Sequence, residues 1–163
     1  MIYEAAVITI SDRASRGVYA DESGKRLQIL LTEQNFRVKS YEVIPDDCEL
    51  IKERLIALSE EGIHLVLTSG GTGFSQRDVT PEATQAVIEK QTPGICEAMR
   101  AEGAKKTPMA YLSRGVSGIR KKSLLINFPG SPKACEENFA AILPFLQHGL
   151  EILNGSDHSG HTK

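Results

Sequence analysis

The sequence has no strong excess of either charge and no long hydrophobic run. Nineteen lysines and arginines stand against 21 aspartates and glutamates, which gives a formal net charge of −2. A protein that binds nucleic acid without regard to sequence carries a basic excess, so this balance argues against that class. No apolar run approaches the roughly 18 residues of a membrane-spanning helix. Glycine and proline together make up about 13% of the 163 residues, well below the roughly 25–30% of low-complexity chains.

Cysteines are few, and the first residues do not resemble a secretory signal. Cys48, Cys96 and Cys135 are far apart and form no CxxC pair, which argues against a disulfide framework and a zinc site. Glu4 precedes the first apolar run, and no basic region comes before it. We therefore expect a cytoplasmic protein with reduced thiols. Its length suits one domain, which we place at residues 1–155, followed by a disordered tail at 156–163.

Apolar patterns of strand length alternate along the chain with patterns of helix length. This order predicts an α/β fold, a three-layer sandwich with a largely parallel central sheet flanked by helices. The segment 111–120 looks irregular and is expected to lead into a hairpin or crossover. We expect strands at 5–10, 37–43, 63–67 and 123–128, and helices at 23–34, 49–61, 80–90, 92–103 and from about 132 to 153.

A buried strand runs directly into a glycine-rich turn, Thr68-Ser69-Gly70-Gly71-Thr72-Gly73. Glycine allows positive φ and a close approach of the backbone to a ligand, and turns of this kind can bind anions through their N–H groups. Ligands bind at the carboxyl ends of strands in open α/β sheets. A tight turn without a ligand is the alternative. Neither familiar phosphate motif fits, because no lysine follows Gly73 and Gln76 stands where a dinucleotide fingerprint needs glycine.

Two charged residues, Arg77 and Asp78, follow this turn and precede a helix that Thr80 is expected to cap and Pro81 to open. An arginine can bind a phosphate through two parallel hydrogen bonds, and a carboxylate beside a polyphosphate is a natural Mg²⁺ ligand. The start of a helix also favours an anion. In the alternative interpretation, Asp78 only caps the turn and Arg77 is a solvated charge.

Polar clusters follow three other predicted strands, at 11–17, 45–47 and 127–133. Because the carboxyl ends of parallel strands lie on one edge of a sheet, we expect these clusters to converge with the glycine turn. Together they offer carboxylates for a metal and cations and N–H groups for phosphate, which indicates phosphoryl or nucleotidyl transfer. Each cluster also has a local explanation, since Asp47 can cap the next helix and Ser131 can start the last one.

Six segments resemble, in order, the MogA/MoaB family of molybdopterin-binding proteins, and the resemblance covers about residues 3 to 153. Members of this family include molybdopterin adenylyltransferase and the G domain of gephyrin. A single GGTG turn would be a weak match, whereas all six segments in the family's order are highly specific. The segments are 10–15 (ISDRAS), 44–46 (IPD), 68–73 (TSGGTG), 77–83 (RDVTPEA), 112–114 (LSR) and 127–133 (NFPGSPK).

The resemblance implies a reaction and a set of site residues. The terminal phosphate of molybdopterin attacks the α-phosphorus of ATP, adenylyl-molybdopterin forms and pyrophosphate leaves, as a step in molybdenum cofactor biosynthesis. Asp78 matches a family acid needed for catalysis and Asp46 a second acid near Mg²⁺–ATP, so both are expected Mg²⁺ ligands. The other residues expected to bind pterin, nucleotide or phosphate are Ser11, Arg13, Thr68, Ser69, Gly70, Gly71, Thr72, Gly73, Arg77, Ser113, Arg114, Pro129, Gly130, Ser131 and Lys133.

The resemblance also implies a homotrimer and a partner protein that inserts metal into the product. Neither nucleic acid nor a membrane is expected as a partner. Two alternatives remain, a molybdopterin-binding paralogue without catalysis and a trimeric scaffold module. The presence of Asp46, Asp78 and the glycine turn favours the enzyme, and no linker or extra domain for a scaffold is visible.

Overall fold

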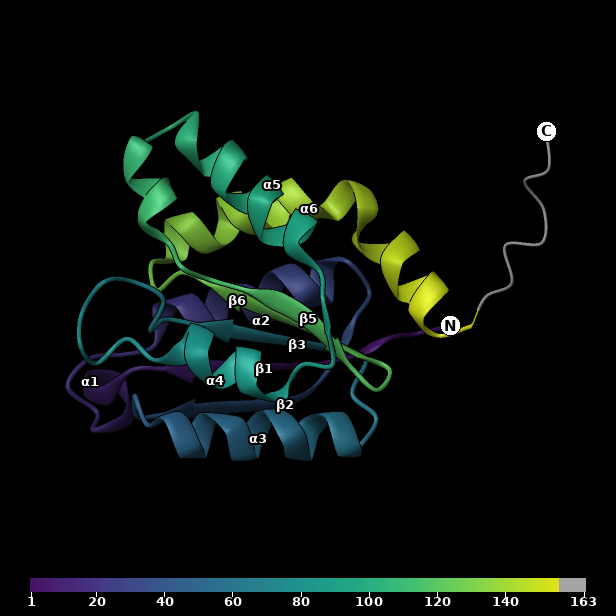
Figure 1. Ribbon diagram of the computed structural model, residues 1–163, viewed down its shortest axis with the longest axis horizontal. Helices are drawn as coiled ribbons and strands as arrows, with labels where there is room; N and C mark the ends of the chain where they lie inside the picture. The colour runs from purple at the N-terminus through teal and green to yellow at the C-terminus, as the bar shows by residue number, and fades with distance from the viewer. Residues whose placement is uncertain (156–163) are drawn as a thin grey trace.

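The computed structural model describes residues 1–155 and contains a six-stranded mixed sheet (Figure 1). The expected tail, 156–163, lies outside the described residues. Four strands pair in parallel, and the last two pair antiparallel at one side. The order across the sheet is β2 (Arg37–Ile44), β1 (Glu4–Ile10), β3 (Leu65–Ser69), β6 (Ser123–Phe128), β5 (Ser117–Arg120) and β4 (Lys90–Gln91).

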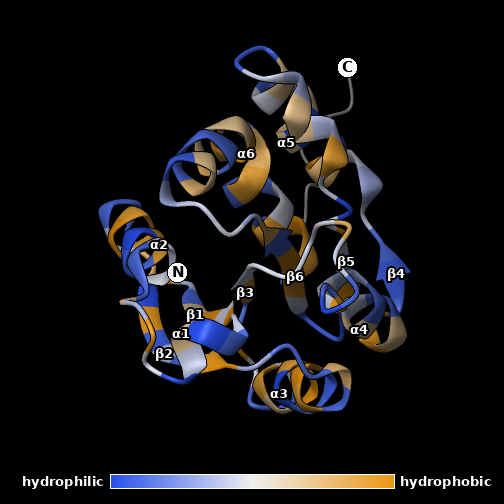
Figure 2. Ribbon diagram, turned by 90° about the vertical axis from the view of Figure 1, so that its left-hand side faces the viewer, coloured by the Kyte–Doolittle hydropathy of each residue, from blue (hydrophilic) through white to orange (hydrophobic). Residues whose placement is uncertain are grey.

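Helices cover both faces of the sheet and make the three layers that the sequence predicts (Figure 2). Side chains from α2, α5 and α6 pack on one face, and those of α3 and α4 pack on the other. The chain adds one short helix and one 3₁₀ helix near the carboxyl ends of the strands. The helices are α1 (Asp12–Ser15), α2 (Glu22–Glu33), α3 (Cys48–Glu60), α4 (Thr80–Val87), α5 (Pro93–Ala104), η1 (Pro108–Leu112) and α6 (Pro132–Leu153).

The central strands are apolar on both sides, because each side faces a helical layer. Val7, Leu67 and Ile126 form one row across β1, β3 and β6, and all three belong to the core under α2, α5 and α6. Their neighbours Val66 and Leu125 point to the opposite core, under α3 and α4. This period of two explains why continuous apolar runs, rather than alternating ones, mark these strands.

Helix caps agree with the sequence in two places and differ in one. Asp47 accepts a hydrogen bond from the N–H of Leu50 at 3.0 Å and so caps α3, and Ser131 caps α6 in the same way. Thr80, expected as a cap, is instead the first residue of α4 and follows Val79. The N–H of Thr80 donates to the carbonyl of Gly71 at 3.2 Å, which ties its backbone to the glycine turn.

Two other expectations need correction or completion. The helix predicted to reach residue 90 ends at Val87, because the chain turns into β4 and the N–H of Glu89 donates to the carbonyl of Ile119. The uncertain segment before β6 forms a hairpin, since β5 pairs antiparallel with β6 across a turn at Lys121 with φ of 53°. Pro144 lies inside α6, and the ribbon changes direction along this helix (Figure 1).

The packing of α6 on the sheet gives a direct test of the core. Phe139 is 1% exposed and its ring lies 6.4 Å from that of Phe128 on β6, whereas Phe145 on the same helix is 38% exposed. We expect Phe139→Ala to lower the free energy of unfolding by about 3–5 kcal/mol, through lost burial and a cavity. Phe145→Ala is the matched control and should cost less than about half of that. Urea denaturation followed by circular dichroism measures both, and equal losses would contradict this account of the core.

Candidate functional site

The carboxyl ends of β1, β2, β3 and β6 converge at one edge, as the sequence predicts. The N–H of Ser11 donates to the carbonyl of Ile44 at 2.9 Å, which joins the ends of β1 and β2. The N–H of Gly70 donates to the carbonyl of Phe128 at 3.0 Å and joins the ends of β3 and β6. The polar clusters that follow these strands are therefore neighbours in space.

The glycine turn passes so close to its neighbours that side chains are excluded at its first positions. Gly70 has φ of 98°, and a Cβ there would lie 2.4 Å from the carbonyl oxygen of Ile10. Gly71 has φ of 68°, and a Cβ there would lie 2.2 Å from Oγ1 of Thr80 and 3.1 Å from a carboxylate oxygen of Asp46. Both the backbone conformation and the space require glycine. The turn thus lies directly against the acidic side chains of the site.

Three carboxylates and one arginine lie beside this turn. Asp12 and Asp46 exchange backbone-to-carboxylate hydrogen bonds of 2.9 and 3.0 Å, and Arg77 donates two hydrogen bonds of 2.9 Å to the Asp12 carboxylate. The Arg77 guanidinium holds the pKa of Asp12 below its usual range. Burial raises the pKa of Asp46, and the negative charges of Asp12 and Asp78 raise it further against the opposing hydrogen bond from Asp12. One cation against three carboxylates leaves this cluster with excess negative charge.

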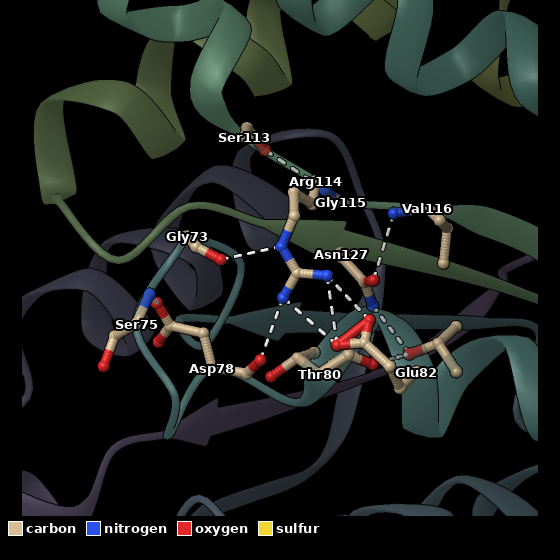
Figure 3. A network of polar contacts seen from close by, with 11 residues as sticks. Gly73, Ser75, Asp78, Thr80, Glu82, Ser113, Arg114, Gly115, Val116 and Asn127 are labelled. Carbon is tan, nitrogen blue, oxygen red and sulfur yellow. Dashed lines mark hydrogen bonds and ion pairs between the residues drawn. The ribbon is translucent and has the colours of Figure 1, made fainter.

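Arg114 braces the loop that carries Asp78 (Figure 3). Its guanidinium donates to the carbonyl of Gly73 at 2.7 Å, to the carbonyl of Asp78 at 2.9 Å and to both carboxylate oxygens of Glu82. The N–H of Arg114 also donates to the carbonyl of Thr72. These contacts within the protein hold the shape of the loop, and the expected contact of Arg114 with substrate stays a prediction.

Two cavities adjoin the glycine turn and share Gly70, Gly71, Asp78 and Gly130 as walls. The first, which we call the α5–α6 cavity, has a volume of about 430 Å³ and lies under α5, η1 and the start of α6. The second, the Asp21 cavity, has a volume of about 450 Å³ and contains Asp46 in its wall. Each volume is within the usual range for a small-molecule site. The arrangement offers room for two ligands that meet at Asp78.

Most of the predicted binding residues line these cavities. Gly70–Gly73, Ser113, Pro129 and Gly130 all line the α5–α6 cavity, and Ser11 lines the Asp21 cavity. Ser69 lines the Asp21 cavity too, although its hydroxyl donates to the carbonyl of Pro129.

Other predicted residues have structural partners or lie outside the cavity walls. Thr68 is buried and accepts a hydrogen bond from Asn127, and Arg13 lies over the ring of Tyr19 at 5.5 Å. Neither of these predicted residues, nor Lys133, is part of a cavity wall.

Several functional candidates have no clear signal in the sequence. Asp12 lies within the predicted cluster at 11–17, but its link to Asp46 depends on the pairing of β1 and β2. Arg100 and Glu137 come from helices and reach the α5–α6 cavity only because α5 and α6 pack together. Asp21 accepts hydrogen bonds from Thr9, Ser23, Tyr41 and Gly24, which outweigh burial and lower its pKa.

The carboxylates fit a metal that arrives with phosphate ligands. Across residues 1–155, no group of three or more histidine, cysteine or acidic side chains is arranged to hold a metal ion unaided. Mg²⁺ is usually bound by one or two carboxylates together with water and substrate phosphates. Asp46 carries a raised pKa caused by burial and by neighbouring anions. The missing Cβ atoms of Gly71 and Gly73 let the backbone of the turn lie directly against the carboxylates of Asp46 and Asp78. Asp46 and Asp78 therefore suit such a shared site.

Fold and site together define an α/β protein that gathers carboxylates, a glycine turn and two cavities at the carboxyl edge of its sheet. A family model described as a probable molybdopterin binding domain matches residues 6–148. The chain belongs to this family, as the sequence motifs predict. In the described part of the chain, no helix has the length and apolar character needed to cross a membrane.

Named relatives agree with this assignment. The chain is 44% identical over 153 residues to a molybdopterin adenylyltransferase of Helicobacter pylori strain J99, covering 92% of this chain and 87% of that protein. It is 43% identical over 140 residues to the Escherichia coli K12 protein of the same name, covering 83% and 71%. The crystal structure of the molybdopterin biosynthesis enzyme MoaB from Thermus thermophilus superposes with a TM-score of 0.90 at 42% identity, covering 95% of this chain and 98% of that one.

The repulsion around Asp46 predicts a substitution that stabilises the fold. Because the folded pKa of Asp46 lies above its unfolded value, stability present at low pH is lost as the pH rises through the folded pKa. Asp46→Asn keeps the acceptor for the N–H of Asp12 and removes the charge. We expect its Tm to exceed that of the original protein by roughly 1–3 °C at pH 7, with a smaller difference near pH 4.

Mg²⁺ provides a second test with the same pair of proteins. In the presence of ATP, whose phosphates supply further ligands, the ion should raise the Tm of the original protein and raise that of Asp46→Asn less, because one carboxylate is neutralised. Differential scanning calorimetry in ATP, with and without millimolar Mg²⁺, measures both effects. A lower Tm for the variant at pH 7 without the ion would contradict the repulsion inferred here.

Proposed function

We propose that this chain adenylylates molybdopterin with Mg²⁺–ATP and so takes part in molybdenum cofactor biosynthesis. The observation that carries the proposal is the meeting of two ligand-sized cavities at Asp78, Gly70 and Gly71. A reaction that joins two substrates needs their reacting phosphates to lie side by side, at the wall that the two cavities share. The enzyme class predicted from the sequence is confirmed by the relatives named molybdopterin adenylyltransferase at 43–44% identity.

The chain's own groups serve the reaction chiefly by positioning. A phosphate oxygen of molybdopterin forms a bond to the α-phosphorus of ATP while the bond from that phosphorus to the bridging oxygen breaks, and pyrophosphate leaves with the bonding electrons. The glycine turn follows the end of β3, and the short α1 and longer α4 begin nearby. Backbone N–H groups in such turns and at helix starts can bind anions. Holding both phosphates in line supplies most of the catalysis for such transfers.

Asp46 and Asp78 are the proposed ligands of Mg²⁺, which when bound supplies positive charge to offset the two polyanions. Asp78 is fixed for this task, because its carboxylate accepts a hydrogen bond from the N–H of Ser75 at 3.0 Å and Arg114 holds its carbonyl. Asp46 is held by the N–H of Asp12. The bidentate pair of Arg77 with Asp12 keeps a guanidinium at the edge of the cluster, where it is 66% exposed and accessible to a phosphate.

Four further expectations belong to the proposal, and two of them, the homotrimer and the partner protein, rest on the resemblance alone. They are a homotrimer, a cytoplasmic location, Mg²⁺ as the metal, and a protein partner that receives the product for metal insertion. Light scattering of the purified chain tests the first.

A molybdopterin-binding paralogue without catalysis remains the alternative of interest, because cavities and a glycine turn suit binding as well as transfer. The carboxylate cluster favours the enzyme, since a protein that only binds an anionic pterin gains nothing from three acidic side chains beside its phosphate.

An adenylylation assay tests the proposal with a matched pair of variants. Asp78→Asn keeps an acceptor for the N–H of Ser75 and removes one charge, so we expect kcat to fall at least about 100-fold with little change in molybdopterin binding. Asp47→Asn is the control, because asparagine caps α3 as well as aspartate does and its activity should be unchanged. Formation of adenylyl-molybdopterin from ATP and Mg²⁺ is followed by chromatography. Tight binding of molybdopterin without product from the original protein would support the binding-only alternative.

A further inference from the structure

The α5–α6 cavity has apolar walls and a small number of charged groups. Met99 from α5 and Met109 and Leu112 from η1 supply flat or flexible apolar surface, which suits an aromatic ring. Arg100 is occupied, since its guanidinium donates to the carbonyl oxygens of Ser113 at 3.4 Å and Gly115 at 2.9 Å. Glu137 is the one acidic side chain in the wall besides Asp78 among the described residues. Its role is not explained by the transfer of the adenylyl group.

Glu137 carries a carboxylate oxygen that its surroundings do not satisfy. Oε1 is shielded from solvent and has no hydrogen-bond partner within residues 1–155, although the side chain belongs to the cavity wall. Lys106 places its Nζ 3.5 Å from this oxygen, but the lysine side chain is 61% exposed and makes no hydrogen bond to it. A shielded carboxylate oxygen without a donor is costly, which indicates that a ligand provides the donor.

The shape of a carboxylate determines which ligand edge suits it. Two oxygens accept best from two parallel N–H donors. A pterin offers such a pair on its pyrimidine edge, at N3–H and the 2-amino group. Adenine offers only one donor there, its 6-amino group, beside the lone pair of N1, which a carboxylate repels. A rotation of the carboxyl group about its terminal torsion presents both oxygens to the cavity at small cost.

We propose that Glu137 binds the 2-amino-4-oxo edge of the pterin and thereby admits the pterin, and not adenine, to the α5–α6 cavity. This inference rests on the proposed function and deepens it, because an enzyme with two heterocyclic substrates must keep each in its own cavity. Glu137 is a specificity-determining residue and touches no reacting phosphate. Its loss therefore affects binding of molybdopterin rather than the turnover of bound substrates.

The test compares Glu137→Gln with the original protein by calorimetric titration of molybdopterin under anoxic conditions. Glutamine replaces one acceptor by a donor that faces a pterin N–H, so we expect Kd to rise about 10- to 100-fold. The KM for ATP and kcat at saturating molybdopterin should stay within about twofold. Glu136→Gln is the matched control, since Glu136 pairs with Arg26 of α2 and lines neither cavity, and its Kd should equal that of the original protein.

A pair of small probes tests the recognised edge itself. Hydroxymethyllumazine differs from hydroxymethylpterin in having a carbonyl in place of the 2-amino group, and with it a proton on N1, while N3–H is kept. The original protein should lose bound molybdopterin to the pterin at roughly tenfold lower concentration than to the lumazine, and Glu137→Gln should lose this preference. Equal competition by the two probes against the original protein would overturn the proposal.

Lys106→Met separates ligand recognition from a purely structural ion pair. If Glu137 serves only to hold Lys106, both variants lower Tm alike and Lys106→Met weakens molybdopterin binding as much as Glu137→Gln, which would overturn the inference. An unchanged Kd for Glu137→Gln alongside normal adenylylation would also overturn it while leaving the proposed function intact. Selective pterin binding without any adenylylation would overturn the proposed function alone.

Discussion

The parallel pairing of β1, β3 and β6 is the constraint on which the whole site depends. Parallel strands end on the same edge, so the segments after Ile10, Ser69 and Phe128 must share one small region. Gly70 makes this sharing possible, because its missing Cβ lets the turn lie against the carbonyl of Ile10. The polar groups proposed to contact a ligand phosphate lie around this contact between the backbones of Gly70 and Ile10.

The carboxylates gathered at this edge of the sheet destabilise the folded state by their mutual repulsion, and they suit a bound cation. Burial and the charges of Asp12 and Asp78 raise the pKa of Asp46, and Arg77, paired with Asp12, offsets part of this negative charge. An arrangement that costs folding energy at a cavity is typical of a functional site. The small net charge of −2 therefore goes together with a local excess of negative charge at this edge of the sheet.

The two cavities differ in the residues that line them, which suits each to a different part of the substrates. The Asp21 cavity is lined by residues at the ends of β1 and β3 and by the segment that leads into α2. The α5–α6 cavity is walled by helices and carries Glu137, which is distant along the chain from the glycine turn. In the proposed reaction, recognition of the pterin and handling of phosphate therefore come from different parts of the chain. The glycine turn and Asp78 are the common wall where these tasks meet.

The sequence by itself determined the order of strands and helices, the family, the glycine turn and the convergence of polar clusters, because apolar periodicity and glycine placement are local properties. It failed at Thr80 and at the end of α4, where contacts with Gly71 and β5 overrode local capping and helix preferences. Only the tertiary structure decided that Arg114 braces a loop, that Arg77 pairs with Asp12, and that Glu137 reaches a cavity. A side chain's partner depends on which distant segments pack beside it, and no short stretch of sequence contains that information.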